Sequence, residues 1–104
     1  MLGGAADLAP STRTHLSFEA AGEFQAPGNG GDYRGRNFHF GVREHGMCAI
    51  ANGMALSKLL PYASGFFIFT DYCRASIRLA ALMELPVLYL RWRFPCATWW
   101  CNGG

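Results

Sequence analysis

Four side chains have types and spacing suited to holding a flat, hydrogen-bonding ring. Glu44 stands just before an apolar pattern with helical spacing, and Phe66, Phe69 and Tyr72 recur at intervals of three. Aromatic faces pack well against planar heterocycles, and a carboxyl group can share a proton with a ring nitrogen. A simpler interpretation is that Glu44 only complements a helix dipole and that the three rings belong to the core.

A strand and a helix are predicted ahead of the aromatic residues. Residues 37–40 alternate polar and aromatic side chains, which is typical of a strand. The apolar side chains of the next segment fall on one helical face, at Met47, Ile50, Ala51 and Met54. Pro61 is expected to end this helix.

Further strands and a second helix complete the pattern. Residues 66–69 form a continuous apolar run, which predicts a strand buried on both faces. Thr70 or Asp71 can cap the helix that follows. The apolar stripe of that helix is Cys73, Ile77, Ala80 and Ala81. Residues 87–90 predict another buried strand, and residues 2–8 hold the end of an earlier one. The alternation predicts an α/β fold, a partial parallel sheet with flanking helices.

Two turns matter for the site. A spacing of three does not keep side chains on one face of a strand, so the chain must leave the strand after Phe69 for the rings to converge, and the break at Thr70 and Asp71 supplies that turn. Residues 9–35 are rich in turn formers and predict a long loop. Within the loop, residues 15–24 have the pattern of a short helix.

Composition excludes several classes of protein. The 104 residues suit one small domain, and a hydrophobic content of 51% supports a packed core. The net charge of +2 comes from scattered residues, with no basic run for nucleic acid. No apolar run reaches the ~18 residues that span a bilayer, so no membrane role is predicted. Without a secretory signal the four cysteines are interpreted as free thiols in a reducing, cytoplasmic compartment, and no metal site is predicted.

Three segments resemble the transketolase family in order and spacing. Residues 3–11, GGAADLAPS, are similar to the family's GGSADLAPS, and residues 39–47, HFGVREHGM, are similar to HFGIREHAM. Residues 66–72, FFIFTDY, match a third family segment. The resemblance covers residues 2–90. It implies that residues 1–90 are part of a thiamine diphosphate-binding pyrimidine domain.

The resemblance assigns roles to individual residues. Glu44 corresponds to the glutamate that hydrogen-bonds the aminopyrimidine ring and promotes loss of the thiazolium proton. Asp7 corresponds to an acidic residue near the cofactor at the dimer interface, and Ser11 to a serine that helps bind the sugar substrate's phosphate. The aromatic pocket for the aminopyrimidine corresponds to Phe66, Phe69 and Tyr72. A purely structural role for the turn-forming residues 7–11 stays open.

The histidines receive no role from this resemblance. Imidazoles titrate near neutral pH and are frequent acid–base groups. The family's catalytic histidines do not correspond to His39 or His45, and His15 is expected to be solvated in its loop.

The function implied by the resemblance is transfer of a two-carbon ketol unit from a ketose phosphate to an aldose phosphate. The parent enzyme is expected to be a homodimer. Its magnesium and the diphosphate of its cofactor are held by a domain without counterpart in this sequence, so we expect the isolated chain to be inactive. The Arg-Glu-His triplet at residues 43–45 favours the sugar-transferring branch. The alternatives are a dihydroxyacetone synthase-like enzyme, and a non-catalytic fragment or subunit that pairs with another chain.

Residues 91–104 depart from the family pattern. The family continues here with a histidine-bearing segment, whereas this chain has no histidine after residue 90 and no helical or strand period. We expect this tail to be disordered and to result from a shifted reading frame or from read-through of non-coding sequence. The alternative is a genuine divergent end.

Overall fold

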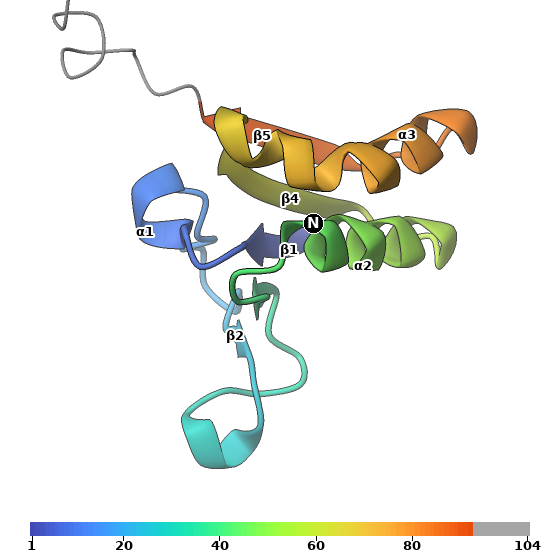
Figure 1. Ribbon diagram of the computed structural model, residues 1–104. Coiled ribbons are helices and arrows are strands. Elements are labelled where there is room, and N and C mark those ends of the chain that lie inside the picture. The colour runs from blue at the N-terminus through green and yellow to red at the C-terminus, as the bar shows by residue number, and fades with distance from the viewer. Residues whose placement is uncertain (93–104) are drawn as a thin grey trace, which may run out of the picture.

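Five parallel strands form a single sheet in the computed structural model, which describes residues 1–92 (Figure 1). The strands are β1 (Leu2–Ala5), β2 (Glu23–Phe24), β3 (Asn37–His39), β4 (Pro61–Phe66) and β5 (Leu88–Trp92). Their order across the sheet is β2-β3-β1-β4-β5. The predicted α/β class, a parallel sheet with flanking helices, is therefore confirmed.

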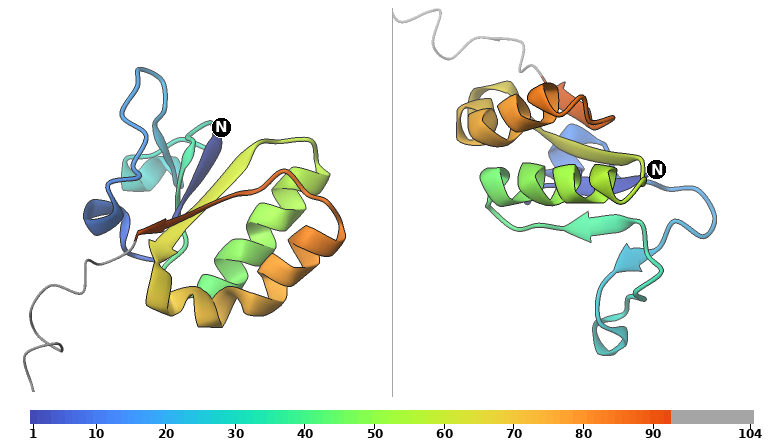
Figure 2. Two further views of the ribbon diagram at one scale, coloured as in Figure 1. Left: turned by 90° about the horizontal axis from the view of Figure 1, so that it is seen from above. Right: turned by 90° about the vertical axis from the view of Figure 1, so that its right-hand side faces the viewer.

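Two helices cover one face of the sheet. Helix α2 (Glu44–Leu56) joins β3 to β4, and α3 (Arg74–Leu82) joins β4 to β5. They lie side by side on the same face (Figure 2). Both connections run in the same direction across the sheet, and right-handed crossovers then require the same face. The short α1 (Ala9–Thr12) and the loop that follows it lie away from this helical layer.

The core fills the space between the sheet and the two long helices. Its buried residues are Ala6, Phe40, Met47, Cys48, Ala51, Ala63 and Cys73. On α2, Met47 and Ala51 are buried as predicted, whereas Ile50, predicted on the same apolar face, is 46% exposed. The buried face is rotated toward Cys48 and Asn52 because α2 packs against α3 as well as the sheet.

The helix predicted for residues 15–24 is wrong. This segment is irregular and ends in β2. The 3-10 helices found within residues 1–92 lie elsewhere, at Pro27–Asn29 and at Phe67–Cys73 (η2). The buried side chain of Asn37 accepts from the Leu16 amide at 2.8 Å and donates to the Leu16 carbonyl at 3.0 Å. Both backbone groups of Leu16 are thus paired with a side chain rather than with helical neighbours.

The strand predicted for residues 66–69 is also wrong. β4 spans Pro61–Phe66, and the apolar run continues as η2 (Phe67–Cys73). Pro61 accordingly begins a strand instead of ending a helix, since α2 stops at Leu56. Neither predicted cap is used: α3 starts at Arg74 without a side-chain cap, and Asp71 pairs with Arg74 at 3.1 Å instead.

The last strand, β5, extends into the first two residues of the predicted tail. The backbones of Arg91 and Trp92 continue β5, opposite Gly65 and Phe66 of β4. The remainder of the predicted tail, residues 93–104, lies outside the described residues, as does the expectation of disorder made for it. Within residues 1–92, no helix has the length and apolar character needed to cross a membrane.

Candidate cofactor site

The carboxyl edge of the sheet gathers the predicted site residues from three strands. Asp7 follows β1, Glu44 opens α2 after β3, and Phe66 is the last residue of β4. Because β1 lies between β3 and β4, the ends of these three strands are neighbours. Open α/β sheets bind ligands at this edge, where successive connections leave in opposite directions.

Four of the predicted residues line one open groove. Asp7, Glu44, Phe69 and Tyr72 surround a space of about 480 Å³. The other lining residues are apolar: Ala6, Leu8 and Val42. The Tyr72 side chain is 66% exposed, so the groove opens to solvent at that end. A planar ring that enters it would meet aromatic faces on one wall and carboxylates on the others.

The aromatic row depends on the 3-10 helix. Side chains three residues apart nearly eclipse one another in this type of helix. The centroids of Phe66 and Phe69 are 6.2 Å apart, and those of Phe69 and Tyr72 are 6.5 Å apart. The three rings therefore converge as expected, although the chain leaves the strand at Phe66 rather than after Phe69.

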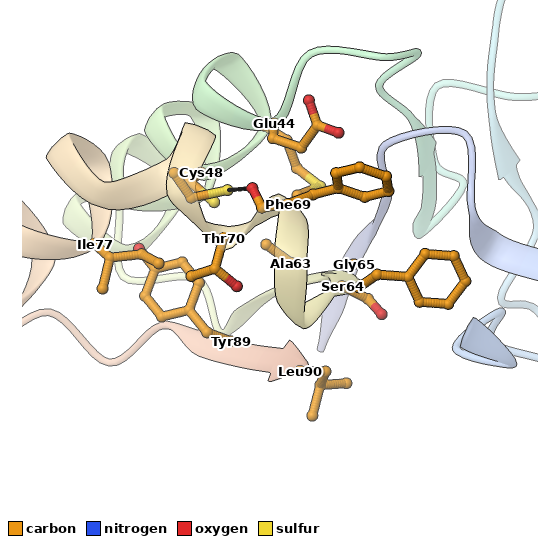
Figure 3. A pocket seen from close by; sticks show the side chains of 13 residues that line it. Glu44, Cys48, Ala63, Ser64, Gly65, Phe69, Thr70, Ile77, Tyr89 and Leu90 are labelled. Carbon is orange, nitrogen blue, oxygen red and sulfur yellow. Dashed lines mark hydrogen bonds between the residues drawn. The ribbon is translucent and has the colours of Figure 1, made fainter. Parts of the chain in front are cut away.

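A small cavity adjoins the groove and shares Glu44 and Phe69 with it; Figure 3 shows its lining side chains. Its volume of about 20 Å³ is enough for roughly one water molecule. Phe66 lines this cavity and is not among the residues that line the groove. Figure 3 shows Glu44 and Cys48 from α2 on one side and Tyr89 from β5 on the other.

Two thiols form part of the cavity wall and were not predicted as site residues. Cys48 and Cys73 are buried free cysteines. Burial raises the pKa of each thiol, and the charge of Glu44 acts in the same direction. Both thiols therefore stay neutral near neutral pH, and the floor of the site carries no charge from them. The sequence signal was the position of Cys48, one helical turn after Glu44.

A buried polar network fixes α2 against its neighbours. The Asn52 side chain donates to the Ser76 carbonyl at 2.8 Å and accepts from the Tyr89 hydroxyl at 2.7 Å. The Ser76 hydroxyl donates to the His45 carbonyl at 3.2 Å, next to Glu44. These bonds link α2 to α3 and β5 and hold the helix that carries Glu44. A polar residue on the buried face of an otherwise apolar helix was the signal for Asn52.

Ser11 lies apart from the groove. It is exposed on α1 and is not among the groove's lining residues. Asp7 is shared between the groove and a second pocket of about 420 Å³, which Pro10 also lines. The structure thus brings together Asp7, Glu44, Phe69 and Tyr72 in the groove. Phe66 lines the adjoining small cavity, and Ser11 lines neither.

The second pocket contains a cluster that sequence reasoning missed. Glu23 places one carboxylate oxygen against the His15 ring and the other 2.6 Å from His39 Nε2. The three residues come from three separate segments, so no local spacing could reveal them. Among residues 1–92, no three His, Cys, Asp or Glu side chains are arranged to hold a metal ion.

The parallel sheet, the acidic start of α2 and the aromatic row define an α/β domain whose carboxyl-edge groove suits a planar ring. The family model for the transketolase pyrimidine binding domain matches residues 1–98. The chain belongs to this family.

Curated relatives agree with this assignment. The chain is 50% identical over 92 residues to a chloroplastic transketolase of Craterostigma plantagineum and 52% identical over 90 residues to a transketolase of Bacillus subtilis. Each match covers 86% of this chain but only 17% and 13% of the relatives. A crystal structure of transketolase from Pichia stipitis, in complex with sedoheptulose 7-phosphate, superposes with a TM-score of 0.79 at 40% identity, over 86% of this chain and 14% of that one.

Proposed function

We propose that the groove formed by Asp7, Glu44, Phe69 and Tyr72 receives the aminopyrimidine ring of thiamine diphosphate. The observation that carries the proposal is the convergence of these four side chains from three segments in one groove. Two aromatic rings offer faces to a flat heterocycle. The half-buried carboxyl group of Glu44 offers an oxygen to a ring nitrogen. The residues present therefore fit the aminopyrimidine half of the cofactor.

Glu44 is proposed to hold or share a proton at the ring nitrogen. When bound, thiamine diphosphate supplies a carbon acid that becomes the nucleophile in ketol transfer. Phe69 and Tyr72 fix the plane of the ring, and the Phe66 ring lies next to Phe69, with the two centroids 6.2 Å apart. The neutral thiols of Cys48 and Cys73 keep the deep end of the site free of competing charge. Asp7 closes the groove from the β1 side.

For the whole protein we propose transfer of a two-carbon ketol unit between sugar phosphates by a homodimer. The proposal rests on the relatives, of whose length this chain covers 13–17%. Magnesium and the cofactor's diphosphate would be held by a further domain, and Ser11 would contact the substrate's phosphate. The 104-residue chain supplied with thiamine diphosphate and magnesium should accordingly give no ketol transfer.

The test is a chimera in which residues 1–90 replace the matching segment of a full-length relative. Glu44→Gln keeps the side chain's size but cannot share a proton as a carboxyl group does. We expect a loss of roughly 10²–10⁴-fold in the rate of C2 hydrogen–deuterium exchange of bound cofactor. Glu84→Gln, at an exposed residue after α3, is the matched control and should exchange like the unchanged chimera. Equal rates in both variants would assign Glu44 to scaffolding.

A further inference from the structure

We propose that a pocket at the amino edge of the sheet binds a small anion that carries a planar aromatic ring. The lining of this amino-edge pocket includes residues 33–36, residues 58–60, Phe24 and Phe38. Residues 33–36 precede β3, and residues 58–60 lie between the end of α2 and the start of β4. The volume of about 540 Å³ is within the usual range for sites of small molecules. The pocket shares no lining residue with the cofactor groove, so the inference is independent of the proposed function.

Three aromatic rings in contact form the apolar part of the lining. Phe24 stacks on Phe38 with the ring centroids 4.4 Å apart, and Tyr33 meets Phe24 in a tilted arrangement at 5.9 Å. Tyr33 is 64% exposed, and Phe24 and Leu60, which line the same pocket, are exposed as well. Apolar side chains that gather in one exposed hollow indicate a binding surface, whereas single exposed ones do not. A flat aromatic ligand would cover these side chains and stack on the exposed ring faces.

The charged side chains in the lining are all positive. They are Arg34, Arg36 and Lys58, and none of the ion pairs found within residues 1–92 involves any of them. The Arg36 guanidinium lies 5.6 Å from the Phe18 ring centroid, which leaves Arg34 and Lys58 as the cations that meet a ligand. The nearby Asp32 accepts from the Arg34 amide at 3.3 Å and does not line the pocket. A guanidinium matches the geometry of a carboxylate or phosphate, so the complementary ligand is an anion.

Lys58 has a backbone conformation that ordinarily belongs to glycine. Its φ is 62°, and the Leu59 amide donates to the Met54 carbonyl at 3.0 Å, as in the Schellman motif that closes many helices. A β-carbon makes this left-handed conformation costly, and the attraction of the ammonium for the carboxyl end of α2 offsets part of that cost. Residues in unfavourable backbone conformations cluster at functional sites. A contact between the lysine ammonium and an anion in the pocket accounts for a side chain at this position.

The two edges of the sheet differ in the charge that they present to a ligand. The cofactor groove at the carboxyl edge has the carboxyl groups of Asp7 and Glu44 in its lining, whereas the amino-edge pocket has Arg34 and Lys58. Like charges repel and opposite charges attract an approaching ligand. An aromatic ring with a negative charge should therefore enter the amino-edge pocket and avoid the groove, although both contain aromatic side chains.

The test is titration of the isotope-labelled 104-residue chain with 2-naphthoate, followed by the NMR shifts of backbone amides. We expect saturable shifts at residues 33–36 and 58–60 with a Kd of roughly 1 mM, as is usual for a ligand of this size. The amides of Glu44 and Tyr72 in the groove should not shift. The neutral alcohol 2-naphthalenemethanol has the same ring and should bind about 3–10-fold more weakly, since it lacks the charge.

Lys58→Gly and Arg34→Gln should each weaken naphthoate binding about 3–10-fold. The thermal midpoint of Lys58→Gly should equal or exceed that of the wild type, because glycine relieves the backbone strain, so its lower affinity would not be due to unfolding. Arg78→Gln is the matched control: it removes an exposed positive charge on α3, outside the pocket, and should bind like the wild type.

Four results would overturn the assignment of an aromatic anion to the amino-edge pocket. They are no saturable shift up to about 20 mM naphthoate, equal affinity for naphthoate and the alcohol, shifts in the groove in place of the pocket, and undiminished binding in both Lys58→Gly and Arg34→Gln. Self-association of the ligand-free chain through residues 33–36 and 58–60, without naphthoate binding, would assign the pocket to a second copy of the chain instead.

Discussion

The Tyr89 hydroxyl donates a 2.7 Å hydrogen bond to the side-chain oxygen of Asn52, which ties β5 to the buried face of α2. Tyr89→Phe removes the donor and leaves a buried acceptor unpaired, so we expect a loss of about 1–3 kcal/mol in the free energy of unfolding. Tyr33→Phe, at a residue 64% exposed, is the control and should change little. Urea unfolding measures both. Equal losses in the two variants would mean that the Tyr89 bond contributes nothing specific.

Ionisation of Tyr89 is expected to lower the stability of the fold at alkaline pH. Burial raises the pKa of Tyr89 to about 12, with Cys48 and Cys73 adding to the effect. A raised pKa gives stability that is fully present below the unfolded value, about 10, and is lost as the pH rises through the folded value. We therefore expect the free energy of unfolding to fall between about pH 10 and 12, with a shallower fall in Tyr89→Phe. Parallel slopes in the two proteins would contradict this assignment.

The buried thiols should resist alkylation in the folded chain. Only the thiolate reacts. Each unit by which burial raises the pKa of a thiol lowers its thiolate fraction about tenfold. Iodoacetamide should therefore modify Cys48 and Cys73 at least about tenfold more slowly in the native chain than in urea. Mass spectrometry of the two separate peptides gives both rates. Modification of either cysteine at its denatured rate under native conditions would show that it is not enclosed as described.

Replacement of glycine by alanine is expected to change stability in opposite directions at Gly4 and at Gly53. A Cβ on Gly4 in the central strand would lie 2.0 Å from the Phe38 carbonyl oxygen, and the β3 backbone cannot yield. Gly4→Ala should therefore cost about 1–3 kcal/mol or more. A Cβ on Gly53 in α2 meets nothing within 4 Å, so Gly53→Ala should stabilise by roughly 0.5–1 kcal/mol. Thermal unfolding of both variants tests the prediction, and a stable Gly4→Ala would contradict the close approach of β1 and β3.

Asp7 occupies a strained conformation at the edge of the candidate site. Its φ is 60°, in the left-handed region, and its amide donates to the Ala5 carbonyl at 2.8 Å. We expect Asp7→Gly to be more stable than Asp7→Ala by about 0.5–1 kcal/mol, because only glycine adopts this conformation without steric cost. At Ala49, exposed in α2, the order should reverse, and Ala49→Gly should lose stability. If alanine were the better residue at position 7, the strain would be absent.

Much of the fold could be predicted because the pattern of side chains is local. Residues 37–40 and 87–90 were correctly assigned to strands, and α2 and α3 were found from apolar spacing. The run at residues 66–69 was misassigned, since a short apolar stretch has no period that separates a strand from a helix. The edge strand β2 was missed for a related reason, because its two residues are too few to show any alternation.

The sequence alone determined the α/β class, the family resemblance and the identity of the side chains proposed to hold the cofactor. Those depend on residue types and on spacings along one segment. Only the tertiary structure decided that Asp7, Glu44, Phe69 and Tyr72 share a groove, and that Glu23 meets both His15 and His39. The physical reason is the order of the strands: β1 lies between β3 and β4, which come later in the chain. The pairing of the strands decides which residues far apart in the sequence become neighbours. No local spacing along the sequence encodes that pairing.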